Sequence, residues 1–268
     1  MSGFENYLAI EEIGGPRFHP NHNKLAFVYD APGLLQIYTT PVEEDRINWA
    51  KRETFSVERC TSGRYLSDGS LLFVTDFGGD ENFQIGLITQ HGEQVIVSTD
   101  RKAKHNINTA SDNYLYFSAN IANKAKFDIY RQKIPLRQNR SEMVYSPEKG
   151  VVALSLTSND DDKLVIVNYF SNIHTDLILK DMSNDEVRPL TEHLDPSQWN
   201  AVRFLNEETL LVLTNYNNDF VRPGMLRLDG TFVPYTKLDA MRVQFDAHAF
   251  KEESHPATND PFRRQPSS

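Results

Sequence analysis

The sequence lacks several features that would define its class at once. A single cysteine, Cys60, excludes an intrachain disulfide framework and fits a reducing compartment. No stretch is long and apolar enough to span a bilayer, and the first 13 residues carry acidic side chains without the apolar core of a signal peptide. We therefore expect a cytoplasmic protein without a membrane partner.

Basic charge and phosphate-binding glycines are also scarce. The chain has 28 lysines and arginines against 37 aspartates and glutamates, a formal net charge of −9, with no basic stripe. A nucleic-acid partner is not expected, because such partners need a basic surface. No two of the 13 glycines stand two positions apart, which excludes a G-x-G-x-x-G loop, and we expect no cofactor.

The most informative feature that is present is a repeat. Five short apolar runs of similar composition recur along the chain, and their first residues lie 44 to 49 positions apart. The runs cover residues 25–29, 71–75, 115–119, 164–168 and 210–214. A period of this length is typical of propeller blades.

Other strand-like segments accompany each run, so that each repeat contains four short strands. We predict an all-β fold, a β-propeller of four-stranded blades. Five complete blades are expected near residues 16–56, 58–98, 105–146, 151–191 and 199–236. In the third blade the first strand, 106–109, is weakly apolar and is expected from the repeat alone.

The end of the sequence departs from the repeat. Residues 241–249 alternate between apolar and polar side chains and could form the first strand of a partial sixth blade. Residues 251–268 are polar and interrupted by Pro256, Pro261 and Pro266, so a disordered tail is expected there. The predicted organisation is therefore a propeller over residues 1–250 followed by a tail.

Residues 75–85, Thr-Asp-Phe-Gly-Gly-Asp-Glu-Asn-Phe-Gln-Ile, resemble the D-x-G-G-D-E-x-x-Q hairpin in the propellers of prolyl-oligopeptidase-family (S9) serine peptidases. The likeness is greatest to the acylaminoacyl-peptidase-like branch. Residues 117–120 and 127–130 resemble the next blade of those propellers, and residues 187–191 are similar to a strand that they share with TolB-like repeats. The resemblance covers residues 16–236 and implies a non-catalytic propeller that caps an α/β-hydrolase domain and admits peptides to it.

Two departures from that family matter for function. Family propellers commonly have seven blades, and the hydrolase part is absent from this sequence. A nucleophile elbow needs Gly-x-Ser-x-Gly, yet no glycine here is followed two positions later by serine. We therefore predict no catalytic residue and no enzyme activity on this chain.

The candidate site is the loop that contains Phe77, Gly78, Gly79, Asp80 and Glu81, which could touch a substrate or a partner domain. Its carboxylates could in principle bind calcium, but they lack the spacing of a calcium loop. The two glycines are explained by a hairpin turn that needs positive φ.

Two other polar clusters are interpreted as solvated turns. His19 and His22 offer two imidazoles, but no further ligands of suitable spacing accompany them, so we expect no metal site. The acidic run at residues 159–162 places its carboxylates next to one another, whereas glycoside chemistry needs two carboxylates across a cleft.

Two alternatives to the peptidase-cap hypothesis stay open. The chain could be a free-standing TolB-like propeller that binds a protein or peptide on one face, and five blades fall within the known range. A weaker alternative is an enzyme with a metal ion in the central channel of the propeller. The expected partner is therefore an α/β-hydrolase domain or a peptide or protein ligand.

Overall fold

The computed structural model describes residues 11–235, apart from residues 32, 44, 45, 47, 99, 138, 139, 149, 150 and 193–195. These residues form β-strands joined by turns, and no helix in this part of the chain could cross a membrane. The predicted strand at 241–249 and the predicted tail at 251–268 lie outside the described residues.

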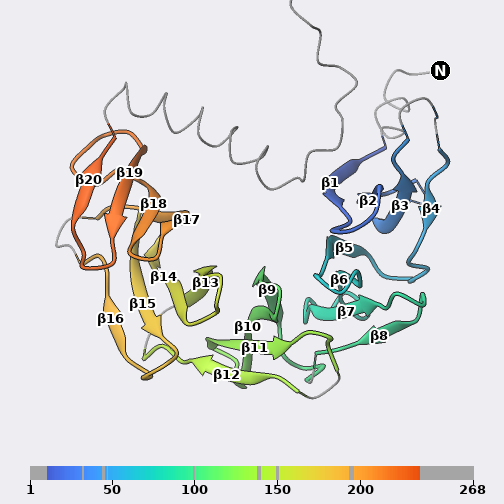
Figure 1. The fold of residues 1–268 in the computed structure, drawn as a ribbon. Coiled ribbons are helices and arrows are strands. Elements are labelled where there is room, and N and C mark those ends of the chain that lie inside the picture. The colour runs from blue at the N-terminus through green and yellow to red at the C-terminus, as the bar shows by residue number, and fades with distance from the viewer. Residues whose placement is uncertain are drawn as a thin grey trace, which may run out of the picture.

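The strands form five antiparallel sheets of four consecutive strands each. The predicted all-β fold with five four-stranded blades is therefore confirmed, and we number the blades 1 to 5 in chain order (Figure 1). Blade 1 contains β1 (Ile13–Phe18), β2 (Lys24–Tyr29), β3 (Gln36–Pro41) and β4 (Lys51–Arg52). Blade 2 contains β5 (Cys60–Tyr65), β6 (Leu71–Thr75), β7 (Gln84–Ile88) and β8 (Gln94–Ile96).

The other three blades repeat this order. Blade 3 contains β9 (His105–Ala110), β10 (Tyr114–Asn123), β11 (Lys126–Lys133) and β12 (Glu142–Tyr145). Blade 4 contains β13 (Val151–Thr157), β14 (Lys163–Ser171), β15 (His174–Asp181) and β16 (Val187–Pro189). Blade 5 contains β17 (Trp199–Asn206), β18 (Thr209–Thr214), β19 (Arg222–Arg227) and β20 (Phe232–Pro234). Strand β9 confirms the weakly apolar strand that the repeat predicts.

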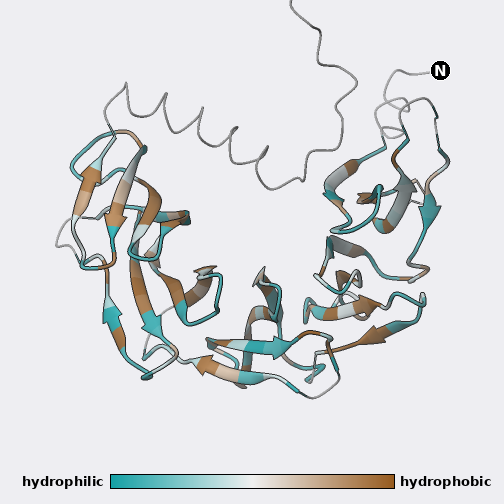
Figure 2. Ribbon diagram, viewed as in Figure 1, coloured by the Kyte–Doolittle hydropathy of each residue, from teal (hydrophilic) through white to brown (hydrophobic). Residues whose placement is uncertain are grey.

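The second strand of each blade is apolar at successive positions because neighbouring blades cover both faces of its sheet. In β14, the four residues Leu164, Val165, Ile166 and Val167 are all buried, two on each face. Figure 2 shows apolar residues in the strands of every blade and hydrophilic residues in most connecting loops. This double burial explains why the repeat appears in the sequence as short continuous apolar runs.

Four apolar cores join the blades in pairs. Ile37 and Phe73 belong to the core between blades 1 and 2, and Ile85 and Phe117 to the core between blades 2 and 3. Separate cores fill the interfaces between blades 3 and 4 and between blades 4 and 5. The described residues of blades 5 and 1 have no comparable packing, and Figure 1 shows the blades as an open arc.

One residue of the acidic run at 159–162 is buried, although the whole run was predicted to be a solvated turn. Asp161 is buried, with φ of 62°. Its carboxylate accepts hydrogen bonds from the side chains of Ser111 (2.9 Å), Asn113 (3.2 Å), Tyr116 (2.9 Å) and Thr157 (3.1 Å). That interpretation was wrong for Asp161, which links blades 3 and 4, because a buried carboxylate is stable when its oxygens are fully hydrogen-bonded.

Candidate functional sites at the two ends of the blades

Each blade has two ends with different turns. The turn between the second and third strands lies at one end, which we call the hairpin end. The turns between the first and second and between the third and fourth strands lie at the opposite end. The candidate residues divide between these ends.

The predicted loop lies at the hairpin end of blade 2, between β6 and β7. Gly78, Gly79 and Glu81 have φ of 68°, 69° and 58°, so three of four successive residues adopt the left-handed conformation. Glycine adopts this conformation without a steric penalty, which explains the glycine pair. The structure places Phe77, Gly78, Gly79, Asp80 and Glu81 together in one turn at the surface.

Contacts within the turn and with the segments on either side of blade 2 hold it in place. The guanidinium of Arg101 lies 4.1 Å from the centre of the Phe77 ring, a cation–π contact. The Gly78 N–H donates to Glu58 Oε1 at 2.7 Å. The backbone N–H and side-chain amide of Asn82 donate to Asp80 at 2.9 and 3.1 Å and keep the pKa of Asp80 below its usual value. Within the described part of the chain, no three acidic, histidine or cysteine side chains are grouped to hold a metal ion.

The glutamine that ends the hairpin motif has a structural role. Gln84 is fully buried; its amide donates to the Ala103 carbonyl at 2.9 Å, and its Oε1 accepts from Ser98 Oγ at 2.7 Å. Ser98 in turn accepts from the Ile85 N–H at 3.2 Å. The same arrangement of an amide or carboxylate, a hydroxyl and a backbone N–H joins Gln36 to Thr54 in blade 1 and Asp176 to Thr191 in blade 4.

A second feature of the hairpin end is an apolar groove of about 620 Å³ between blades 4 and 5. The side chains of Tyr169, Phe170, Leu213 and Val221 line it and are partly exposed. Buried Trp199 also lines it. Tyr169 belongs to a set of aromatic residues whose ordinary role is packing between blades, but here it faces solvent at the groove.

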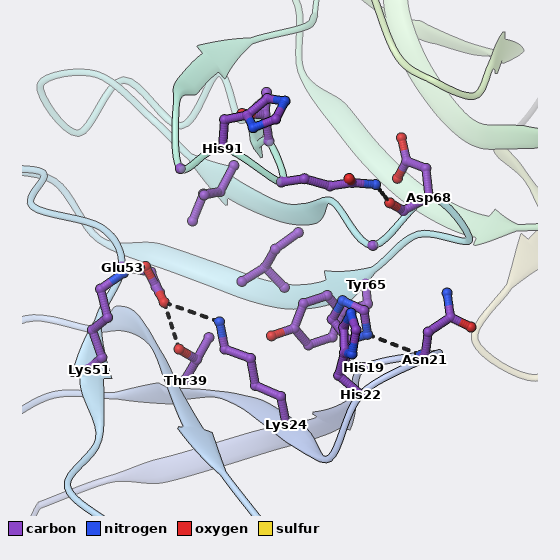
Figure 3. A pocket seen from close by; sticks show the side chains of 16 residues that line it. His19, Asn21, His22, Lys24, Thr39, Lys51, Glu53, Tyr65, Asp68 and His91 are labelled. Carbon is purple, nitrogen blue, oxygen red and sulfur yellow. Dashed lines mark hydrogen bonds and ion pairs between the residues drawn. The ribbon is translucent and has the colours of Figure 1, made fainter.

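The opposite end of blades 1 and 2 contains a polar cavity of about 530 Å³ (Figure 3). Side chains from four segments surround it: two histidines from the β1–β2 turn, a lysine from β2, charged residues in and directly after β4, and a tyrosine from β5. The residues that the analysis below uses are His19, His22, Lys24, Glu53, Tyr65 and Asp68. From the sequence, His19 and His22 are interpreted as part of a solvated turn. No sequence pattern predicts that they lie near Glu53 or Tyr65.

Glu53 is the central acid of the cavity, and its side chain is only 9% exposed. It accepts hydrogen bonds from Thr39 Oγ1 at 2.6 Å and Lys51 Nζ at 2.8 Å, and Lys24 Nζ lies 3.6 Å away. Burial alone would raise its pKa, but the hydrogen bonds from Lys51 and Thr39 and the two ammonium charges together hold the pKa below its usual value. Glu53 is therefore ionised at neutral pH.

The aromatic side of the cavity is formed by three rings. The His19 ring centre lies 4.6 Å from both the His22 and the Tyr65 ring centres, and His19 Nδ1 accepts from the Asn21 N–H at 3.0 Å. Burial, followed by the proximity of His22 and Lys24, lowers the pKa of His19. The Tyr65 hydroxyl is buried without a hydrogen-bond partner among the described residues, and burial raises its pKa to about 12.

These observations define the chain as an all-β propeller with one apolar and one polar candidate site. No protein-family model and no curated protein sequence matches it. Solved structures do: a prolyl endopeptidase matches over 84% of this chain and 36% of its own, with 11% identity and a TM-score of 0.65. Oligopeptidase B from Leishmania major matches over 82% and 33%, with 10% identity and a TM-score of 0.61.

TolB from Acinetobacter baumannii matches over 84% of this chain and 55% of its own, with 18% identity and a TM-score of 0.53. The chain therefore spans about a third of the length of the two peptidases and about half of TolB. Similarity at these identities establishes the propeller fold that they share, and the resemblance noted in the hairpin motif is to the same group of propellers.

Proposed function

We propose that this chain is a non-catalytic propeller that controls the access of peptides to a serine-peptidase domain of the α/β-hydrolase type. The observation that supports this role most strongly is the propeller match to prolyl endopeptidase, together with the hairpin motif at residues 75–85. The lack of any Gly-x-Ser-x-Gly elbow supports a non-catalytic role, because acyl transfer by such an enzyme needs the exposed serine.

The hairpin end of the blades is the face that we assign to peptides. Its groove between blades 4 and 5 offers Tyr169 and Phe170 for apolar side chains, while the edges of the groove carry the amides of Asn172, Gln198 and Asn200. Apolar surface with a few polar groups is the usual composition of a peptide-binding site. The Phe77–Arg101 pair on blade 2 adds an aromatic and cationic contact at the same end.

A labelling experiment on protein purified from its native source tests this proposal. A fluorophosphonate probe, which reacts with active serine hydrolases, should leave residues 1–268 unlabelled and should label an α/β-hydrolase that is either covalently continuous with the chain or bound to it. Labelling within residues 1–268 would contradict the non-catalytic assignment. Purified chain without any labelled hydrolase attached would contradict the gating role.

The similarity to TolB favours a second candidate, a propeller that binds a protein or peptide without a hydrolase. The two candidates predict different results for the exposed groove aromatics. Replacement of Phe170, which is 58% exposed, by Ser should weaken peptide binding in both cases. It should change the length of the peptides that a hydrolase cleaves only if the chain is a gate.

A further inference from the structure

The polar cavity between blades 1 and 2 contains hydrogen-bond donors that lack acceptors. The Lys24 ammonium has one ionic contact, to Glu53 at 3.6 Å, which is longer than a hydrogen bond. The buried Tyr65 hydroxyl has no hydrogen-bond partner among the described residues. Of these two donors the Tyr65 hydroxyl is the buried one, whereas the Lys24 side chain is 41% exposed. A buried donor without an acceptor is destabilising, so a group that supplies an acceptor to Tyr65 would be favoured.

Of the four carboxylate oxygens of Glu53 and Asp68, by contrast, three already have donors. Glu53 accepts from Thr39 and Lys51 and also contacts Lys24. Asp68 Oδ1 accepts from the backbone N–H of Ser70 at 3.0 Å and from its hydroxyl. A cationic ligand would therefore find one carboxylate oxygen without a donor among the described residues, Asp68 Oδ2, whereas an anionic ligand would find the donors of both Lys24 and Tyr65.

The local charge also permits an anion. Lys24 and Lys51 balance Glu53 and Asp68, so that the cavity is formally neutral with its imidazoles uncharged, although the whole chain has a net charge of −9. Protonation of His19, His22 or the nearby His91 would add positive charge. An anion is therefore not repelled here as it would be over most of the surface.

We propose that this cavity binds a small organic anion whose carboxylate or phosphate group accepts hydrogen bonds from the Lys24 ammonium and the Tyr65 hydroxyl. A volume of about 530 Å³ accommodates a molecule the size of a dicarboxylate or a sugar phosphate. Leu71 and Ile88 also line the cavity and provide apolar surface for its carbon skeleton. In Figure 3 the Tyr65 hydroxyl points toward the Lys24 ammonium, and the His22 ring lies beside His19 on the other side of the Tyr65 ring.

Titration calorimetry with inorganic phosphate and, separately, with succinate tests the site and distinguishes the two anion classes. Both titrations use the full chain at pH 7 and constant ionic strength in chloride. We expect saturable binding of one equivalent of at least one of the two anions. If neither anion binds saturably, the proposal is wrong.

Lys24→Gln should weaken that binding about tenfold, since it removes a charge-assisted hydrogen bond and leaves Glu53 with Thr39 and Lys51. Lys124→Gln is the matched control, because Lys124 also lies 3.6 Å from a carboxylate, that of Asp100, but in blade 3 and outside the cavity. The control should bind within about twofold of the unmodified chain. Equal effects of the two substitutions would overturn the assignment.

Tyr65→Phe separates a ligand contact from a structural role. Without the unpaired hydroxyl, the free protein should melt at an unchanged or higher temperature. The increase in melting temperature that the bound anion causes should become smaller, because one donor to the anion is lost. An anion-induced increase equal to that of the unmodified chain would exclude Tyr65 from the site.

Discussion

The interface between blades 1 and 2 differs from that between blades 4 and 5, although the strand order is identical. Blades 1 and 2 separate at one end around ionised Glu53 and the His19–Tyr65 pair. Blades 4 and 5 are joined by buried Trp199, whose ring centre lies 5.4 Å from that of Tyr216 and 5.0 Å from that of Phe232. The same fold therefore carries a polar cavity or an aromatic core, depending on a few side chains near the strand ends.

The substitution with the largest expected effect on stability is Trp199→Ala in the aromatic core. The substitution removes a fully buried indole and leaves a cavity, and it should cost about 3–5 kcal/mol of unfolding free energy. Chemical denaturation monitored by circular dichroism would measure the loss. His19→Ala at the polar interface is the comparison and should cost much less, since that ring already borders a cavity. Similar losses would show that the two interfaces are equally well packed.

Two glycines that lie against aromatic rings allow packing inside blade 2 to be compared with packing inside blade 5. A Cβ atom at Gly86 would lie 2.1 Å from Phe73, which is buried, and one at Gly224 would lie 2.3 Å from Phe232, which is partly exposed on the last strand. We expect Gly86→Ala to lose about 3 kcal/mol and Gly224→Ala less, because Phe232 has more room to move than Phe73, although the backbone oxygen of Val233, 3.0 Å from the new Cβ, must also shift. Thermal melting would detect the difference, and a greater loss for Gly224→Ala would contradict it.

Substitutions in the hairpin turn of blade 2 should change the unfolding free energy less. Gly79→Val introduces a β-branched residue at φ of 69° with open space around it, so that only backbone strain of about 1–3 kcal/mol is expected. Asp80→Ala is the control and should have a small effect on stability, because the two hydrogen bonds that it removes, both from Asn82, lie at the exposed surface. Equal and negligible changes in melting temperature would mean that the left-handed backbone at Gly79 imposes no strain.

The smallest expected effect is a pH response confined to blades 1 and 2. The pKa values of Glu53 and His19 are both lowered in the folded chain, so each group stabilises the fold above its unfolded pKa and loses that contribution as pH falls. The His19 contribution should begin to disappear below pH 6.5, and that of Glu53 below pH 4.5.

Hydrogen exchange at successive pH values would locate this response. After correction for the intrinsic exchange rate, amides of β2 and β5 should lose protection on acidification earlier than those of β17 and β18. The difference should shrink in the Glu53→Gln variant, whose side chain does not titrate. Uniform loss over all blades would contradict a local origin.

The sequence predicted the blades well because their signal is local. Continuous burial of the second strands produces apolar runs such as residues 164–168, and the period then identified β9 despite its weak composition. It also predicted the left-handed backbone at Gly78 and Gly79, since a hairpin turn needs it. These features depend on residues close together in the chain.

The cavity and the buried carboxylate could not be predicted in this way. Asp161 is stabilised by Tyr116 and Ser111, which are 45 and 50 residues away in the sequence. The polar residues next to it in the sequence therefore predicted a solvated carboxylate. Glu53 directly follows β4, Tyr65 ends β5, and His19 lies in the β1–β2 turn. None of these residues belongs to a sequence motif that would mark it as part of a site. Only the packing of one blade on the next combines them.

The open arc has a consequence for how the molecule loses structure. Among residues 11–235, blades 2, 3 and 4 each pack against two neighbours, whereas blades 1 and 5 each pack against one. When repeats contact only their neighbours, stability behaves as in a one-dimensional chain of coupled units, and terminal units open at lower free energy than central ones. Unfolding should therefore proceed inward from both ends, with blade 3 as the last unit to melt.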